Sequence, residues 1–207
     1  MEVRMGLISN SATFTRYQTK DHVPSNYKEQ YAKEIRRYAF REIDENTDDE
    51  RSSGWVNIMN ILDNEFSGEE FFKSGFIALS LRIDTRRIPS HVLKHYCRKA
   101  EMEKKAAMSK DFLSKAERQD IRDMVKFQLL KRVIPNSRTF DMIWDIKNSQ
   151  IFFSSVNEAI STEFLELFKK TFDLNLELLF PYTIAQSAMT DEEKVLLENI
   201  TPANFVK

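Results

Sequence analysis

The sequence contains little of what several protein classes require. Cys97 is the only cysteine, so an intramolecular disulfide framework is excluded and a reducing compartment is favoured. Only four of the 207 residues are glycine, and no glycine-rich loop of the kind that cradles nucleotide phosphates is present. No apolar run approaches the roughly 18 residues that span a bilayer. These absences predict a cytoplasmic protein that uses no cofactor.

Charge is divided unevenly along the chain. The formal net charge is only −1. From Arg82 to Arg132, however, 15 Lys and Arg stand against 7 Asp and Glu, which leaves 16 against 25 in the remainder. The basic segment therefore carries a net charge of +8 and the remainder −9. A segment of this charge density attracts an anionic partner, which the acidic remainder repels.

Apolar periodicity indicates an α+β protein with a mixed β-sheet domain, packed helices and a projecting antiparallel helical hairpin. Strands are expected over 12–17, 55–56, 76–84, 139–146, 150–155 and 174–179, and a polar loop over 44–54. Helices are expected from about residue 24, over 89–108 and 114–132, from a cap at Ser155 to Phe172, and from Thr190. The expected domains are a sheet domain (1–88 and 138–186), a basic tip (89–137) and a C-terminal tail (187–207).

The basic segment is expected to fold as two helices with charged faces. At 3.6 residues per turn, one side of the first helix collects Lys94, Arg98 and Lys105, away from its apolar residues. Ser114 and Glu117 have the spacing of a capping box at the start of the second helix. One side of that helix collects Lys115, Arg118, Arg122 and Lys126. Each helix therefore presents a basic stripe apart from its packing face, as is needed to line a groove with cations.

Basic stripes of this kind bind nucleic acid because neutralised phosphates release condensed counterions, whatever the base sequence. The chain contains no helix-turn-helix spacing, zinc-finger pattern or aromatic-rich strand that would read bases. The residues therefore favour non-specific binding to the phosphate backbone. Two interpretations stay open beside it: a solvated helix surface, and a protein-interaction module whose basic hairpin docks an acidic protein partner.

No catalytic or metal-binding residue is expected. Asp48, Asp49 and Glu50 form an acidic cluster without a supporting histidine or calcium-loop spacing, so a solvated loop is a simpler interpretation than a nuclease site. His91 and His95 are four residues apart on a helix, which is possible ligand geometry, but no HExxH pattern accompanies them. Both tryptophans and the single cysteine are interpreted as core residues.

Several short segments resemble one known family in their order and spacing. They are Gly54-Trp55-Val56, Ile88-Pro89-Ser90, the run from Leu113 to Arg118, Leu129-Leu130, and the run from Met142 to Asp145, followed after a turn by Ile151 to Ser154. Together they extend from about Met5 to Tyr182 and are similar to the RdgC family of bacterial recombination-associated DNA-binding proteins.

The resemblance implies a homodimer that closes into a positively charged ring around double-stranded DNA and restrains RecA-promoted strand exchange in the nucleoid. The hairpin corresponds to the projecting tip of the family, where two subunits meet. Five basic residues match the family pattern and are expected to bind DNA: Lys94, Lys115, Arg118, Arg122 and Arg132. The charge argument adds Arg86, Arg87, Arg98, Lys105, Lys110, Lys126 and Lys131.

Closure of the ring depends on a second dimer contact. Longer members of the family carry a C-terminal lobe that supplies it, and little of this sequence follows Tyr182. An open clamp and a monomer therefore stay open beside the closed ring. The candidate dimer contacts at the two ends of the hairpin are Phe112-Leu113 and Val133-Ile134, with packing inside one chain as the alternative.

Overall fold

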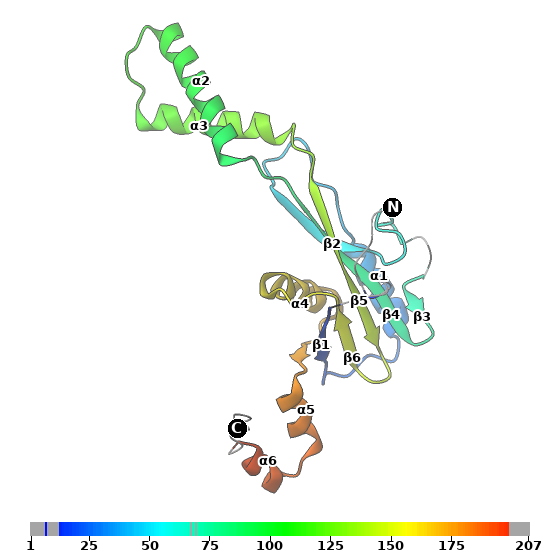
Figure 1. Ribbon diagram of the computed structural model, residues 1–207. Coiled ribbons are helices and arrows are strands. Elements are labelled where there is room, and N and C mark those ends of the chain that lie inside the picture. Colours follow the sequence, from blue (N-terminus) through cyan, green and yellow to red (C-terminus); the bar gives the residue numbers. More distant parts are fainter. Residues whose placement is uncertain (1–6, 8–12, 67, 69, 199–207) are drawn as a thin grey trace. The chain divides into compact units, whose positions relative to one another are not determined.

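The computed structural model describes residue 7, residues 13–66, residue 68 and residues 70–198 (Figure 1). Ala12, which begins the first predicted strand, and residues 199–207 of the predicted tail lie outside the described residues. The elements in chain order are β1 (Thr15–Gln18), α1 (Tyr27–Arg37), β2 (Arg51–Asn57), β3 (Phe72–Lys73), β4 (Phe76–Thr85), α2 (Ser90–Met108), α3 (Lys115–Leu130), β5 (Asn136–Asp145), β6 (Gln150–Phe153), α4 (Glu158–Phe172), β7 (Glu177–Leu178), α5 (Pro181–Ala188) and α6 (Asp191–Glu198). The predicted α+β class is confirmed.

One seven-stranded sheet joins the strands in the order β2-β4-β5-β6-β1-β7, and β3 pairs with β4 beside this path. The predicted β5–β6 hairpin is confirmed, with Trp144 opposite Ile151. Strand β1 pairs antiparallel with β6 and places Tyr17 opposite the same Ile151. An N-terminal strand therefore lies between two strands from the C-terminal half of the chain.

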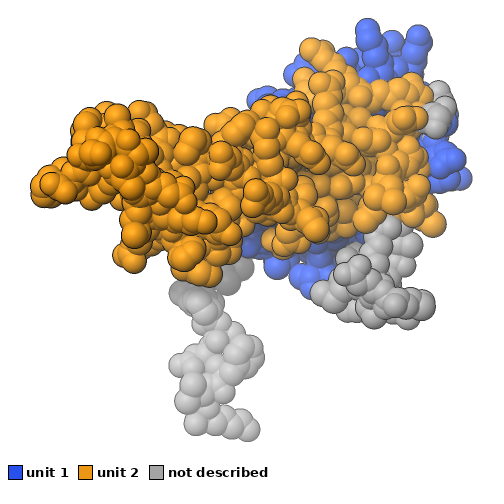
Figure 2. All heavy atoms as spheres, turned by 90° about the horizontal axis from the view of Figure 1, so that it is seen from above, with its two compact units in different colours: residues 1–35, 68–79, 140–207 blue, residues 36–67, 80–139 orange. Residues whose placement is uncertain are grey.

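Packing divides the chain into two compact units (Figure 2). The first comprises residues 1–35, 68–79 and 140–207, and the second comprises residues 36–67 and 80–139. By residue number, β4 and β5 contribute to both units, whereas α2 and α3 belong wholly to the second. The predicted basic tip is therefore a part of the second unit.

Aromatic side chains fill the core of the first unit. The ring of Phe153 on β6 stacks on Phe164 of α4, with ring centroids 4.0 Å apart. Trp144 on β5 contacts Tyr31 of α1 and Phe172 of α4 at centroid distances of 5.6 and 5.2 Å. All five side chains are buried. Helices α1 and α4 thus pack on the face of the sheet from which Trp144 projects, and the core position predicted for this tryptophan is confirmed.

The second unit contains the other tryptophan, Trp55, also fully buried. The main-chain N–H of Trp55 donates to the carbonyl of Tyr38 at 3.0 Å, and the main-chain carbonyl of Trp55 accepts from the Phe40 N–H at 2.8 Å. Gly54 permits this approach, because a Cβ at that position would lie 2.5 Å from the Phe40 Cα. The predicted loop 44–54 is therefore wrong over its last four residues, since β2 already begins at Arg51.

Two other predicted boundaries are wrong. The N-cap of α4 is Asn157, whose side-chain oxygen accepts from the Ile160 N–H at 3.1 Å. The predicted cap, Ser155, does not cap the helix. Its hydroxyl oxygen instead accepts a hydrogen bond from the N–H of Asn157 at 3.2 Å and so helps to position the N-cap residue. The predicted last strand, 174–179, is reduced to Glu177–Leu178 of β7.

Candidate nucleic-acid interface

Helices α2 and α3 form a hairpin (Figure 1). Local hydrogen bonds cap the C-terminal end of α2 and the N-terminal end of α3, which a short loop connects. At the end of α2, Ser109 adopts the left-handed conformation (φ 51°), and its N–H donates to the Ala106 carbonyl. The predicted capping box of α3 is confirmed. The Ser114 N–H donates to Glu117 Oε2 at 2.7 Å, and the Glu117 N–H donates to Ser114 Oγ at 3.2 Å. These bonds with Ser114 hold the pKa of Glu117 below its usual value.

A small aliphatic core joins the two helices. Four side chains in it are buried, namely Leu93, Leu113, Ile121 and Val125, and partly buried residues pack against them, among them Cys97 and Ala100. Leu113 is only 6% exposed, so this candidate dimer contact packs inside its own hairpin instead. Phe112 and Ile134, in contrast, are 85% and 89% exposed, and Val133 is half-buried.

The basic stripes occupy the outer surface of the hairpin. Lys94 and Arg98 are exposed on α2, and Lys105 is half-buried with its Nζ 5.9 Å from the centroid of the Phe112 ring. On α3, the exposed cations are Lys115, Arg118 and Arg122. We call these six residues the basic face: Lys94, Arg98, Lys105, Lys115, Arg118 and Arg122.

A groove of mixed polarity is lined by residues of α2 and α3. Tyr96 of α2 and Met124 of α3 both line this groove. Helical geometry places Lys94 about 160° from Tyr96, so the α2 stripe lies on the side of that helix away from the groove. The α3 cations are not separated from it in this way, because Arg118 and Arg122 lie only about 20° around α3 from the groove residues Val125 and Leu129. Burial raises the pKa of the Cys97 thiol on α2, and the positive charge of Arg122 opposes that rise.

Arg86 does not belong to this surface. Its side chain is 3% exposed and donates from Nε and Nη2 to the Asp49 carbonyl at 3.1 and 2.6 Å. The same Nη2 lies 3.3 Å from the carbonyls of Asp44 and Thr47. The prediction of DNA contact by Arg86 is therefore corrected, because its guanidinium holds the loop 44–50. The neighbouring Arg87 is exposed.

The remaining predicted cations are distributed around the hairpin. Lys126 is half-buried and forms an ion pair with Glu50. Lys110 pairs with Glu117 at 3.6 Å, and Lys131 places its Nζ 4.4 Å from the centroid of the Phe127 ring. Arg132 is exposed and lines the groove between α2 and α3. The basic face therefore comprises the predicted cations on α2 and α3 other than Lys126, and it omits Lys110, Lys131 and Arg132.

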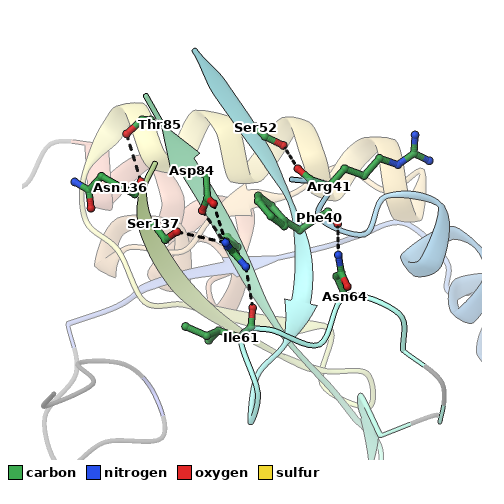
Figure 3. A network of polar contacts seen from close by, with 10 residues as sticks. Phe40, Arg41, Ser52, Ile61, Asn64, Asp84, Thr85, Asn136 and Ser137 are labelled. Carbon is green, nitrogen blue, oxygen red and sulfur yellow. Dashed lines mark hydrogen bonds and ion pairs between the residues drawn. The ribbon is translucent and has the colours of Figure 1, made fainter. Parts of the chain in front are cut away.

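A second arginine, Arg82 on β4, forms a polar network that the sequence reasoning missed (Figure 3). Its Nε and Nη2 donate to the Asp84 carboxylate at 2.9 and 2.8 Å, and its guanidinium lies 4.2 Å from the centroid of the Phe40 ring. Ile61 and Ser137 provide further acceptors. Alternate residues of a strand share a face, so the Arg-x-Asp spacing within the predicted strand could have revealed this pair.

The described residues offer little for catalytic chemistry. Among residues 7, 13–66, 68 and 70–198, no group of three His, Cys, Asp or Glu side chains could hold a metal ion. His91 and His95 are exposed on α2. Burial, with a smaller contribution from Asp173, raises the pKa of Tyr31 to about 12, but this phenol belongs to the aromatic core. None of the helices described here has the length and apolar character to cross a membrane.

The chain was also compared with known proteins. A protein-family model described as "Putative exonuclease, RdgC" matches residues 12–206, which is most of the sequence. No curated protein matches the chain.

Proposed function

The chain belongs to the RdgC family, which confirms the resemblance in its sequence, and we propose on that premise that it binds double-stranded DNA through the basic face of the α2–α3 hairpin. The observation that carries the proposal is the exposure of basic side chains along both helices of the hairpin. Only Lys105 among the six residues of the basic face is half-buried, so the other five side chains can reach phosphates without rearrangement of the fold.

Binding of this kind depends on the phosphate backbone and not on base sequence. Each cation that meets a phosphate releases condensed counterions, which favours association with any duplex. Long lysine and arginine side chains on a helix surface position a protein on DNA, whereas sequence is read by groups that enter a groove. We therefore expect similar affinities for duplexes of different composition.

The proposed biological role is that of the family in recombination. We propose a homodimeric clamp or ring in the cytoplasm, on the nucleoid, that restrains a RecA-type recombinase by occupying duplex DNA. The exposed side chains of Phe112 and Ile134 support a dimer contact at the ends of the hairpin, because large apolar groups in water favour burial against a partner. Leu113 is omitted from this contact since it is buried within one chain.

The proposal assigns the protein a binding role, although the family description contains the word exonuclease. The basic face presents cations, which hold phosphates by charge and need no metal ion to do so. Incubation of an end-labelled duplex with Mg²⁺ or Mn²⁺ should leave the duplex intact. Metal-dependent loss of label would contradict the binding-only role.

The central experiment reverses three charges of the basic face. Substitution of Lys115, Arg118 and Arg122 by glutamate should abolish binding to a random-sequence duplex at low salt. If these residues are instead replaced by glutamine, the slope of log affinity against log salt should fall by up to about 2.7, because each phosphate contact contributes roughly 0.9. Fluorescence anisotropy over a series of salt concentrations measures both quantities.

A matched control reverses three exposed lysines of the first unit, Lys28, Lys33 and Lys169. This variant has the same change in net charge and should retain far more affinity than the hairpin variant. If the two variants bind equally, a general charge effect replaces the basic face as the explanation. If the unaltered protein binds no duplex at low salt but captures acidic proteins, the alternative of a protein-interaction module is favoured.

A further inference from the structure

The acidic loop 44–50 has a fixed backbone and exposed side chains. The buried guanidinium of Arg86 binds carbonyls of Asp44, Thr47 and Asp49, and the Arg86 N–H donates to the Glu50 carbonyl at 2.8 Å. These contacts use only main-chain atoms of the loop. Its five carboxylates, on Asp44, Glu45, Asp48, Asp49 and Glu50, therefore stay free of Arg86, and all five residues are exposed. We call this segment the clasped loop.

The clasped loop lies against helix α3. Glu50 forms an ion pair with Lys126, and the loop residues Thr47 and Asp48 line a common pocket with Lys126 and Phe127. Because the loop backbone is anchored by a buried arginine, the position of the Glu50 carboxylate beside Lys126 is determined by the fold and not only by the ion pair itself.

Lys126 would otherwise extend the basic face. It follows Arg122 by four residues, so it lies one turn further along α3 and only about 40° around it. A carboxylate and a phosphodiester both present anionic oxygens to an ammonium group. Glu50 therefore occupies the place at Lys126 that a DNA phosphate would take if a duplex followed the basic face along α3.

We propose that the clasped loop is a built-in competitor of DNA, which neutralises Lys126 and ends the DNA-binding surface at Arg122. This inference rests on the proposed function of the basic face. The loop keeps the affinity for duplex below the level that the cations of α3 would give by themselves. It also repels phosphates beyond Arg122 through Asp48 and Glu50, and so restricts the path of a duplex to the part of the hairpin near its tip.

The test removes the competing charge without disturbing the clasp. Glu50→Gln keeps the main-chain contacts with Arg86, and we expect it to raise duplex affinity roughly fivefold at 0.1 M salt, which is the scale of one exposed ion pair. The slope of log affinity against log salt should steepen by about 0.9, because Lys126 becomes available for one further phosphate.

Asp49→Asn is the matched control: it removes the same charge from the adjacent residue, which neither pairs with Lys126 nor lines the pocket at α3. Its slope should equal that of the unaltered protein.

Lys126→Gln completes a double-mutant cycle. Lys126→Gln by itself should change the slope of log affinity against log salt only a little. Combined with Glu50→Gln, it should remove the whole increase in affinity and in slope that Glu50→Gln produces. The proposal is overturned if Lys126→Gln alone lowers the slope as much as Arg122→Gln does, or if Glu50→Gln and Asp49→Asn act alike.

The outcomes separate this inference from the proposed function. Duplex binding by the unaltered protein without an effect of Glu50→Gln leaves the function standing and rejects the competitor. If the Glu50→Gln variant binds duplex and the unaltered protein does not, the clasped loop competes strongly enough to prevent DNA binding by the basic face. Absence of duplex binding in every variant at low salt rejects both.

Discussion

The aromatic core of the first unit and the aliphatic core of the hairpin bury very different amounts of side chain. Trp144, Phe153 and Phe164 are fully buried in the former and belong to a continuous set of ring contacts. The cluster between the hairpin helices buries four aliphatic side chains, including Leu93 and Ile121. Each aromatic residue buries roughly 150–250 Å², so the first unit gains more from each core position than the hairpin does.

The difference follows from what each surface must present. Helices α2 and α3 expose charged residues along much of their length, which leaves few positions for a core. A region that buries few apolar side chains unfolds locally at a lower free energy than a region that buries many. The hairpin therefore depends on interactions at its ends, such as the Ser114–Glu117 capping box, to a degree that the sheet does not.

The largest loss of stability is expected in the aromatic core. Phe164→Ala should lower the free energy of unfolding by about 3–5 kcal/mol, because it removes a buried ring that stacks on Phe153 and leaves a cavity. Urea unfolding followed by tryptophan fluorescence measures this change. Phe164→Leu, which keeps much of the apolar volume, should lose less. The comparison fails if Phe164→Ala costs no more than alanine substitutions in the hairpin core.

A smaller, local loss is expected in the hairpin. Ile121→Ala should cost roughly 2–4 kcal/mol and favour opening of α2 and α3 over global unfolding. Hydrogen exchange should accelerate in both helices while β5 and β6 stay protected, and duplex affinity should fall because the basic face loses its scaffold. Met124→Ala is the control on the same helix, since Met124 is 51% exposed and contributes little to the core. Equal acceleration in β6 would show that the two cores are one cooperative unit.

The smallest effect is expected at the cap of α3. Ser114→Ala should cost about 1 kcal/mol of stability in the hairpin. The pKa of Glu117 is lowered in the folded protein, so its stabilising contribution is complete above the ordinary carboxyl pKa and is lost only as pH falls through the lowered value. Ser114→Ala keeps the main-chain N–H that lowers the Glu117 pKa most and removes only the hydroxyl, so the Glu117 pKa should rise part of the way toward its usual value, as a carboxyl NMR titration would show.

Ser90→Ala controls for the loss of a hydroxyl at a helix start. Ser90 is exposed at the first position of α2, whose N-cap makes no side-chain hydrogen bond. The variant should leave the Glu117 titration unchanged. A return of the Glu117 pKa in this variant as well would show that the capping box is not its cause.

Periodicity and capping signals predicted the hairpin well. Helix α2 ends at the predicted Met108, and α3 begins one residue after the predicted N-cap. These signals are local, since a cap needs only residues three apart along the chain. The exposure of five of the six cations agrees with the charged helix faces that the spacing predicts.

Long-range contacts explain what could not be predicted. Arg86 and Arg87 are adjacent and chemically identical, and only the tertiary fold decides that the first is buried against the loop 44–50 while the second faces solvent. The start of β2 was missed for the same reason: Gly54 is indicative of a turn in the sequence, but here it permits the close approach of Phe40. Of the two interpretations of Leu113, a dimer contact and packing inside one chain, the structure supports the second, because Leu113 is buried in the same cluster as Leu93 of α2 and Ile121 of α3.

The way in which Arg86 holds the clasped loop has a consequence for natural variation. Its guanidinium recognises carbonyl oxygens, which every amino acid carries, and so it places no demand on the side chains at positions 44, 47 and 49. It does demand a fixed number of residues between them and a planar group with several donors, which lysine does not offer. Homologues should therefore keep the length of this loop, and the side chains most open to change are those that make no hydrogen bond within it, unlike Asp44 and Thr47.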